Sequence, residues 1–137
     1  MYQKKPGQSY YTNRHSCFLL QYHLVLVTKF RNPVLDGMVK ESVYETIRSI
    51  FDEKKLVILS INGEPDHVHI LFEAGPDICP LELVNVIKTK TARFARRDYP
   101  NEVAKYYWKP YFWSDSYFIT TVGENTVHIV KEYIDNQ

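Results

Sequence analysis

Short apolar runs alternate with amphipathic stretches along the whole chain. Residues 17–30 predict a long strand, and its middle, Leu24 to Val27, is apolar on both faces. We therefore expect a central strand that is covered on both sides. Asp36 can cap a helix over about 37–54. The apolar face of that helix consists of Val39, Val43, Ile47 and Ile50.

The rest of the chain predicts three more strands and two more helices. Pro80 suits the first turn of a helix, and Tyr99-Pro100 should end it. Asn125 can cap the last helix. The remaining elements expected are strands at 56–61, 65–72 and 113–122, helices at 80–98 and 126–137, a turn at NGEPD and an aromatic-rich loop at 101–112.

The order of these elements is β-α-β-β-α-β-α. The first six match the ferredoxin-like (split βαβ) plan of the α+β class, an antiparallel sheet with both helices on one face. Strands one and three are central in that plan. The extra C-terminal helix can then fold over the open face. We expect one domain, residues 1–137, with 1–14 as a mobile arm.

Composition narrows the class of protein. The chain has 137 residues, 45% of them apolar, and a net charge of +1, which fits a globular domain without a global attraction to nucleic acid. The two cysteines lack metal-ligand spacing and suit a reduced, cytoplasmic protein. No segment has the length of a membrane span, so we expect no membrane partner.

The strand at 65–72 carries two histidines on one face. His67 and His69 are two residues apart, so their side chains point the same way, away from Val68, Ile70 and Phe72. Two imidazoles this close can converge on one metal ion. The alternative is a pair of polar residues on a solvated face.

Other polar residues have weaker claims to this site. We expect His23, on the first strand, to be a hydrogen-bonded core histidine rather than a third ligand. His128 should be exposed, and Asp66 should serve the turn. On the last helix, Tyr133 and Gln137 share one face. By itself, Tyr133 would be assigned to packing.

The ordered set of motifs resembles the single-tyrosine HUH transposases of small insertion sequences (TnpA type). The similar segments cover nearly the whole chain, and YIDNQ is similar to the family's tyrosine motif, with a glutamine four residues after the tyrosine. These segments are YHLVLVTKFRNPVL (22–35), PDHVHILF (65–72), IKTKTARFARRDYP (87–100), FWSDSYFITTVG (112–123) and YIDNQ (133–137).

The resemblance implies a mechanism. Tyr133 would cleave single-stranded DNA through a 5′-phosphotyrosine intermediate and leave a 3′-OH. His67, His69 and Gln137 would hold Mg²⁺ or Mn²⁺. The implied partners are single-stranded DNA with a subterminal hairpin and a second copy of the chain. Each tyrosine helix would then be able to complete the His site of the partner chain, and the sequence leaves open whether Tyr133 acts in cis or in trans.

Basic and aromatic residues suggest where DNA binds. The helix at 80–98 carries five cations within ten residues, which favours phosphate contacts over a merely solvated face. With two cations after the first strand, the candidates are Lys29, Arg31, Lys88, Lys90, Arg93, Arg96 and Arg97. Six aromatic residues could stack unpaired bases or fill a small core: Tyr106, Tyr107, Trp108, Tyr111, Phe112 and Trp113.

Three rival functions remain open at this point. A domesticated HUH endonuclease would act on dispersed genomic DNA hairpins. A non-catalytic module would bind single-stranded nucleic acid on the open sheet face, although such modules carry aromatic residues where this strand has His67, His69 and Leu71. A transposase remnant would have lost its chemistry, which the complete His-His-Tyr-Gln set disfavours.

Overall fold

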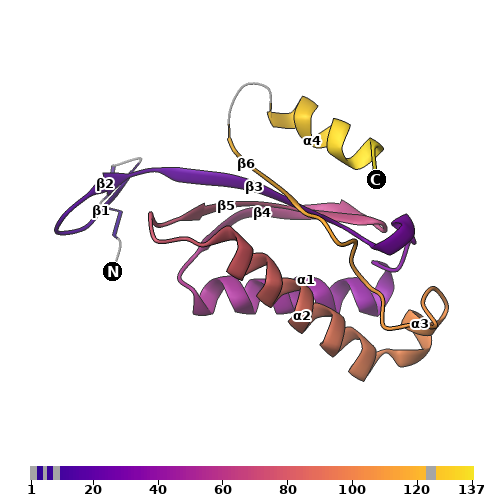
Figure 1. Cartoon of the computed structure of the whole chain (residues 1–137). Helices are drawn as coiled ribbons and strands as arrows, with labels where there is room; N and C mark the ends of the chain where they lie inside the picture. Colours follow the sequence, from indigo (N-terminus) through magenta and orange to yellow (C-terminus); the bar gives the residue numbers. More distant parts are fainter. Residues whose placement is uncertain (1–2, 5, 8–9, 123–125) are drawn as a thin grey trace.

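The computed structural model describes residues 3–4, 6–7, 10–122 and 126–137, with the side chains of 126–129 excepted. Its main sheet is antiparallel, with strand order β4-β5-β3-β6. The strands are β3 (Leu20–Val27), β4 (Val57–Glu64), β5 (His67–Ala74) and β6 (Phe118–Thr121). Helices α1 (Gly37–Glu53) and α2 (Pro80–Asp98) cover one face, and α4 (Thr126–Asp135) lies over the other (Figure 1). The predicted ferredoxin-like fold, with its first and third strands central, is confirmed.

The two faces of the sheet are packed very differently. The face toward α1 and α2 has a large core, which includes Leu24 and Leu26 of β3. The four apolar residues predicted for α1 are all buried there. Among the described side chains, the face toward α4 has a smaller cluster of four buried residues, Val25, Val27, Val130 and Ile134, with Phe118 and Tyr133 packed against it. Since each buried aliphatic side chain contributes about 1.5–3 kcal/mol, far less apolar burial holds α4 than holds α1 and α2.

Two predicted strands are shorter than expected. The strand at 17–30 consists of β2 (Cys17–Phe18) and β3, followed by a 3₁₀ turn, η1 (Lys29–Arg31). The strand at 113–122 shrinks to β6. In its first half, Trp113 keeps an isolated antiparallel bridge to Thr28. The Trp113 side chain is buried in the core, where its indole N–H donates to Thr91 Oγ1 at 2.9 Å.

The other boundaries move little. Strand β4 continues through Asn62–Glu64, so the turn before β5 is only Pro65 and Asp66. Helix α2 begins at Pro80 and ends before Tyr99-Pro100, as predicted, and a short helix, α3 (Pro100–Ala104), occupies part of the predicted loop. Asp36 stands at the N-cap of α1, but its side chain makes no capping hydrogen bond, contrary to the prediction. Asn125 lies outside the described residues.

Part of the segment expected to be a mobile arm has a defined place. Strand β1 (Tyr11–Thr12) pairs with β2. The Tyr11 hydroxyl donates to Glu73 Oε1 at 2.6 Å, and Lys4 Nζ lies 3.3 Å from the same oxygen. Glu73 is near the end of β5, so these contacts attach the described part of the N-terminal segment to the sheet.

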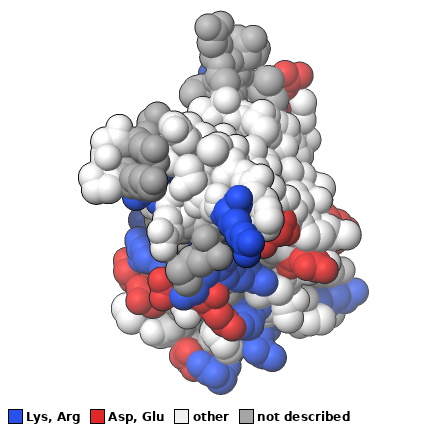
Figure 2. Space-filling view, turned by 90° about the vertical axis from the view of Figure 1, so that its left-hand side faces the viewer, with Lys and Arg blue, Asp and Glu red and all other residues white. Residues whose placement is uncertain are grey.

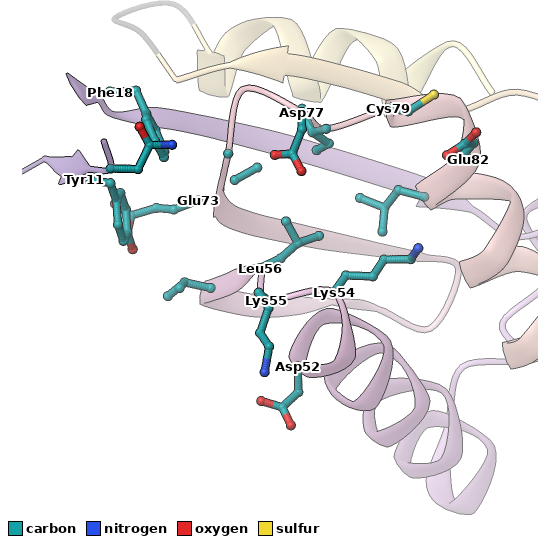
Figure 3. A pocket seen from close by; sticks show the side chains of 16 residues that line it. Tyr11, Phe18, Asp52, Lys54, Lys55, Leu56, Glu73, Asp77, Cys79 and Glu82 are labelled. Carbon is teal, nitrogen blue, oxygen red and sulfur yellow. The ribbon is translucent and has the colours of Figure 1, made fainter. Parts of the chain in front are cut away.

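A cavity of about 750 Å³ lies at this same end of the molecule (Figure 3). Tyr11 and Phe18 line one side, and the start of α2 with Cys79 and Glu82 lines another. Acidic and basic side chains, such as Asp52 and Lys54, both line the cavity. The surface at this end of the molecule likewise carries side chains of both charges (Figure 2). Glu73 and Ala74, at the end of β5, line the cavity, whereas His67 lies at the start of the same strand. The cavity and His67 are thus at opposite ends of β5.

Candidate functional site

His67 and His69 lie on the sheet face that α1 and α2 leave open, as their alternation predicts. Val68 and Ile70, which alternate with them, are buried in the large core. The two imidazole centroids are 5.0 Å apart. His67 is 7% exposed and His69 is half-buried. A Cβ at Gly63 would clash with the carbonyl oxygen of His67, so the neighbouring strand needs glycine at this position.

Asp66 fixes the imidazole of His67. Its Oδ1 lies 2.8 Å from His67 Nδ1, and its Oδ2 accepts from Arg31 Nε at 3.0 Å. Burial alone would raise the pKa of Asp66, but the hydrogen bonds from His67 and Arg31 lower it below its usual value. An ionised Asp66 favours the tautomer with the proton on Nδ1, which leaves Nε2 of His67 as a free acceptor. Asp66 thus has more than the turn role expected for it.

His69 is held in its neutral form. Burial, together with the nearby His67 and His23, lowers its pKa to about 4. Among the described residues, the imidazole of His69 makes no side-chain hydrogen bond, so a nitrogen lone pair stays available. The centroid of His23 lies 5.7 Å from that of His69. Burial lowers the pKa of His23, and its buried Nδ1 lacks a hydrogen-bond partner within the described part of the chain, so the expected hydrogen-bonded core histidine is wrong at this atom.

The donor set fits a divalent cation that needs further ligands. Two neutral imidazoles supply nitrogen donors without charge. Within the described ranges, no third His, Cys, Asp or Glu joins them in a group that could hold a metal. A cation held here would therefore take its remaining ligands from an amide, from a substrate or from water.

Tyr133 and Gln137 meet at Ser116. The Ser116 hydroxyl donates to Gln137 Oε1 at 3.3 Å and lies 2.8 Å from the Tyr133 hydroxyl, which is then the donor in that pair. Gln137 Nε2 also donates to the backbone oxygen of Tyr133 at 3.2 Å. The ring of Tyr133 packs on Phe118 of β6, with centroids 5.1 Å apart. Ser116 was not among the residues expected at the site, since a serine before a strand carries no distinctive pattern.

The ladder register separates the tyrosine from the histidines of its own chain. Val25 of β3 pairs with His69 on one side and with Phe118 on the other. Adjacent strands are about 4.8 Å apart, so the backbones at His69 and Phe118 are separated by roughly 10 Å. The ring of Tyr133 packs on Phe118 of β6 and against the cluster that includes Val25 and Val27 of β3, and its hydroxyl meets Ser116, whereas the His pair lies on β5.

Most of the expected DNA-binding cations have partners in the protein. Lys88 donates to the carbonyl oxygens of Ser114 and Ser116 at 2.7 and 3.0 Å, and burial lowers its pKa. Arg96 donates to the Tyr111 carbonyl oxygen at 2.7 Å. The other ion pairs are Lys29 with Asp115, Arg31 with Asp66 and Arg97 with Asp98.

Two cations of α2 remain available for phosphate. In the part of the chain that the structure describes, Lys90 and Arg93 make no side-chain hydrogen bond or ion pair, although Arg93 stacks on Phe94 with its guanidinium 5.2 Å from the ring centroid. The other predicted cations have partners within the protein, and DNA binding by any of the seven stays a prediction. Lys88 and Arg96 donate hydrogen bonds to the backbone between α3 and β6 and so hold that segment against α2.

The aromatic stretch divides between the two roles considered for it. Tyr107, Phe112 and Trp113 are buried in the large core. Trp108 is 86% exposed and Tyr106 is 39% exposed. The core-filling alternative is confirmed for the three buried residues, and base stacking stays a prediction for the exposed ones. The side chain of His128, predicted to be exposed, lies outside those that the structure describes. The helices in the described ranges are too short or too polar to cross a membrane.

The comparisons with known proteins agree on one family. The family model described as "Transposase IS200 like" matches residues 16–137. The ISDra2 transposase TnpA of Deinococcus radiodurans is 32% identical over 133 residues, which are 97% of this chain and 90% of that protein. The transposase of insertion sequence element IS200 from Salmonella typhimurium is 28% identical over 123 residues, or 90% of this chain and 80% of that protein.

Solved structures support the same fold. A crystal structure from Deinococcus radiodurans superposes with a TM-score of 0.84 and 30% identity, covering 92% of this chain and 96% of that one. A REP-associated tyrosine transposase bound to a REP hairpin has a TM-score of 0.59 and 9% identity, covering 88% and 68%. The second likeness shows the fold alone.

Proposed function

The chain belongs to the IS200-like transposase family, and on that premise we propose that it cleaves and rejoins single-stranded DNA at the ends of an insertion sequence. The observation that carries the proposal is the combination of two adjacent imidazoles on β5, with centroids 5.0 Å apart, and a tyrosine on α4 over the same sheet face. The solved relative with a bound REP hairpin supports hairpin DNA as the partner.

His67 and His69 would hold Mg²⁺ or Mn²⁺, with Gln137 Oε1 as a third protein ligand. When bound, the cation would polarise the scissile phosphate and neutralise charge that develops on it. Asp66 would keep His67 in the tautomer that ligates, and Arg31 would keep Asp66 ionised. The low pKa of His69 means that protonation does not compete with ligation near neutral pH.

Tyr133 would be the nucleophile. Its phenolic oxygen attacks phosphorus, and the bond from phosphorus to the 3′-oxygen breaks. The phenol gives up its proton to solvent, and the departing 3′-oxygen takes up a proton from solvent. The products are a 5′-phosphotyrosine and a free 3′-OH. Attack by another 3′-OH reverses the step and restores the phenol, so strands rejoin without an external energy source.

A homodimer with exchanged tyrosine helices fits the placement of the groups. Tyr133 and Gln137 are held at Ser116, on the far side of β3 from their own His pair. Among the side chains that the structure describes, α4 is held by a smaller apolar cluster than α1 and α2 are. We infer that the helix swings out and that Tyr133 and Gln137 complete the His site of the other subunit.

The test of the chemistry is a covalent-adduct assay on denaturing gels. The protein is incubated with single-stranded DNA from the ends flanking its gene, with Mg²⁺ or Mn²⁺ and then with chelator. We expect a metal-dependent adduct that Tyr133→Phe abolishes while hairpin binding remains. An adduct of normal yield in Tyr133→Phe would refute the mechanism.

The test of the exchanged helix mixes two inactive variants. Tyr133→Phe retains the His pair, and His67→Ala retains the tyrosine. If the site is shared, the mixed dimer contains one site with both groups, and the mixture recovers about a quarter of the wild-type adduct. If each chain serves itself, the mixture stays inactive. As a control, Tyr133→Phe is mixed with the double variant Tyr133→Phe/His67→Ala. No adduct should be recovered, because neither chain then carries the tyrosine.

A further inference from the structure

An exposed phenylalanine stands in strained backbone just after β3. Phe30 is 69% exposed, and its backbone angles are φ 60° and ψ 15°. The next residue, Arg31, is also left-handed, with φ 53°. Residues other than glycine seldom adopt this conformation, and here the aromatic ring gains little burial in return. Stability of the fold does not account for a phenylalanine at this position.

Phe30 belongs to a group of two rings and one cation. Its ring lies edge-on to Tyr111, with centroids 5.6 Å apart and an interplanar angle of 87°. Lys29 Nζ lies 5.5 Å from the Phe30 centroid and 5.3 Å from that of Tyr111. We call Phe30, Tyr111 and Lys29 the Phe30 platform. An aromatic face beside a cation is the combination that binds the bases and phosphates of single-stranded nucleic acid.

The backbone around the platform is fixed before any ligand arrives. The Tyr107 hydroxyl donates to the Lys29 carbonyl oxygen at 2.7 Å, and the Lys29 N–H donates to the Phe112 carbonyl oxygen at 2.8 Å. Arg96 holds the carbonyl of Tyr111 at 2.7 Å. A ring carried on such a frame loses little freedom when a ligand stacks on it.

The platform adjoins the His67 end of the sheet. Phe30 lies between Thr28, whose N–H donates to the Asp66 carbonyl oxygen at 2.9 Å, and Arg31, whose guanidinium binds the Asp66 carboxylate. Asp66 in turn binds His67. A strand whose phosphate sits at the His pair would therefore have its neighbouring nucleotides close to Phe30.

We propose that the Phe30 platform stacks one unpaired base of the single-stranded DNA next to the scissile phosphate. Lys29 would exchange its ion pair with the exposed Asp115 for the backbone phosphate of that nucleotide. The inference rests on the proposed DNA cleavage and adds a base-binding subsite to it. Phe30 is a positioning residue here: it would place the strand, and His67 and Tyr133 would perform the chemistry.

The test combines a protein substitution with the removal of single bases. The probe is a hairpin oligonucleotide with its single-stranded flank, taken from the DNA adjoining the gene, and an abasic site is moved through the flank one nucleotide at a time. Affinity is measured in the Tyr133→Phe background, so that it needs no cleavage. Phe30→Ala is compared with Phe30→Trp and with Leu81→Ala, which truncates an exposed apolar residue in the first turn of α2.

We expect Phe30→Ala to weaken binding of the intact probe by about tenfold, as for one stacked base. In the Tyr133→Phe protein, an abasic site at one position should cause the same loss of affinity. In the variant that also carries Phe30→Ala, that abasic site should cause no further loss of affinity. Phe30→Trp should retain affinity, and Leu81→Ala should leave it unchanged. Additive losses at every position, or wild-type affinity in Phe30→Ala, would overturn the inference.

The remaining outcomes separate this inference from the proposed function. If Phe30→Ala binds DNA normally but loses the dimer in solution, the ring belongs to a protein interface and the inference fails. If the wild-type protein forms no covalent adduct while one abasic position shows the non-additive loss, the subsite stands and the proposed chemistry fails.

Discussion

The two ends of strand β5 carry polar groups on the same open sheet face, but they are satisfied in different ways. Glu73, near one end, is 4% exposed and accepts hydrogen bonds from three side chains, those of Lys4, Tyr11 and Gln21. His67 and His69, at the other end, have one side-chain hydrogen-bond partner between them within the described residues, Asp66. The oxygens of Glu73 all have donors within the protein. The imidazoles keep ring nitrogens that have no hydrogen-bond partner among the described residues.

The difference separates a structural site from a candidate functional one. A buried carboxylate with a donor on each oxygen is satisfied within the protein, and the role of Glu73 is to attach the N-terminal segment to the sheet. A half-buried imidazole with an unused nitrogen, such as that of His69, lowers the stability of a fold unless something else binds it. Burial raises the pKa of the Tyr11 phenol to about 12, with the Glu73 hydrogen bond and charge adding to it, so Tyr11 stays a donor. The following predictions test this contrast.

The largest effect is expected for His69→Ala. The substitution removes one of two nitrogen ligands, so metal-dependent adduct formation should fall by more than the 10- to 100-fold that loss of an outer-shell partner causes, to about the background level. The stabilisation of the folded protein by Mn²⁺, read as a rise in Tm, should vanish with it. Retention of that rise would place the cation elsewhere. Glu73→Gln is the matched control and should keep it.

A smaller effect is expected for Asp66→Asn. The amide can no longer supply the charge that favours the Nδ1–H tautomer of His67, so Mn²⁺ affinity should drop by roughly 10- to 100-fold. Titration calorimetry or the Mn²⁺-dependent rise in Tm would measure it. Excess Mn²⁺ should restore adduct formation in Asp66→Asn but not in His69→Ala. Equal and unrescued losses in both variants would mean that Asp66 does more than orient His67.

The sequence predicts one of these clusters well and misses the other. The His pair stands out because two polar residues interrupt an otherwise apolar strand with a period of two. Glu73 shows no such signal: its partners Tyr11 and Gln21 are 62 and 52 residues away, and only the tertiary fold joins them. Long-range side-chain partnerships of this kind leave no local pattern.

The same reason explains what the sequence could not show about the candidate DNA interface. Helical spacing correctly placed Lys88 and Arg96 on α2, but it could not show that backbone carbonyls of the segment before β6 use both cations. Helix propensity and proline signals located α2 to the residue, because those signals are local. Phe30 was missed because nothing in the sequence marks a phenylalanine as exposed in left-handed backbone.

The smallest effect on the chemistry, but a clear one on stability, is expected for Glu73→Gln. Burial raises the pKa of Glu73, but the hydrogen bonds from Tyr11, Gln21 and Lys4 lower it by more, so the net shift is downward. A carboxyl with a depressed folded-state pKa stabilises the protein above the unfolded value of about 4.3, and this stability is lost as pH falls through the folded-state pKa.

The variant should therefore be destabilised by about 1–3 kcal/mol at pH 7, since hydrogen bonds to a charged acceptor are weakened, and Lys4 contributes little because solvent screens it. The difference in Tm between wild type and Glu73→Gln should shrink on acidification below about pH 4, where the wild-type carboxyl takes up its own proton. Thermal melts at pH 7, 5 and 3 measure this. A constant difference across that range would mean that the variant acts through packing rather than through the charge, and an accompanying loss of the Mn²⁺ response would mean that the two ends of β5 are coupled.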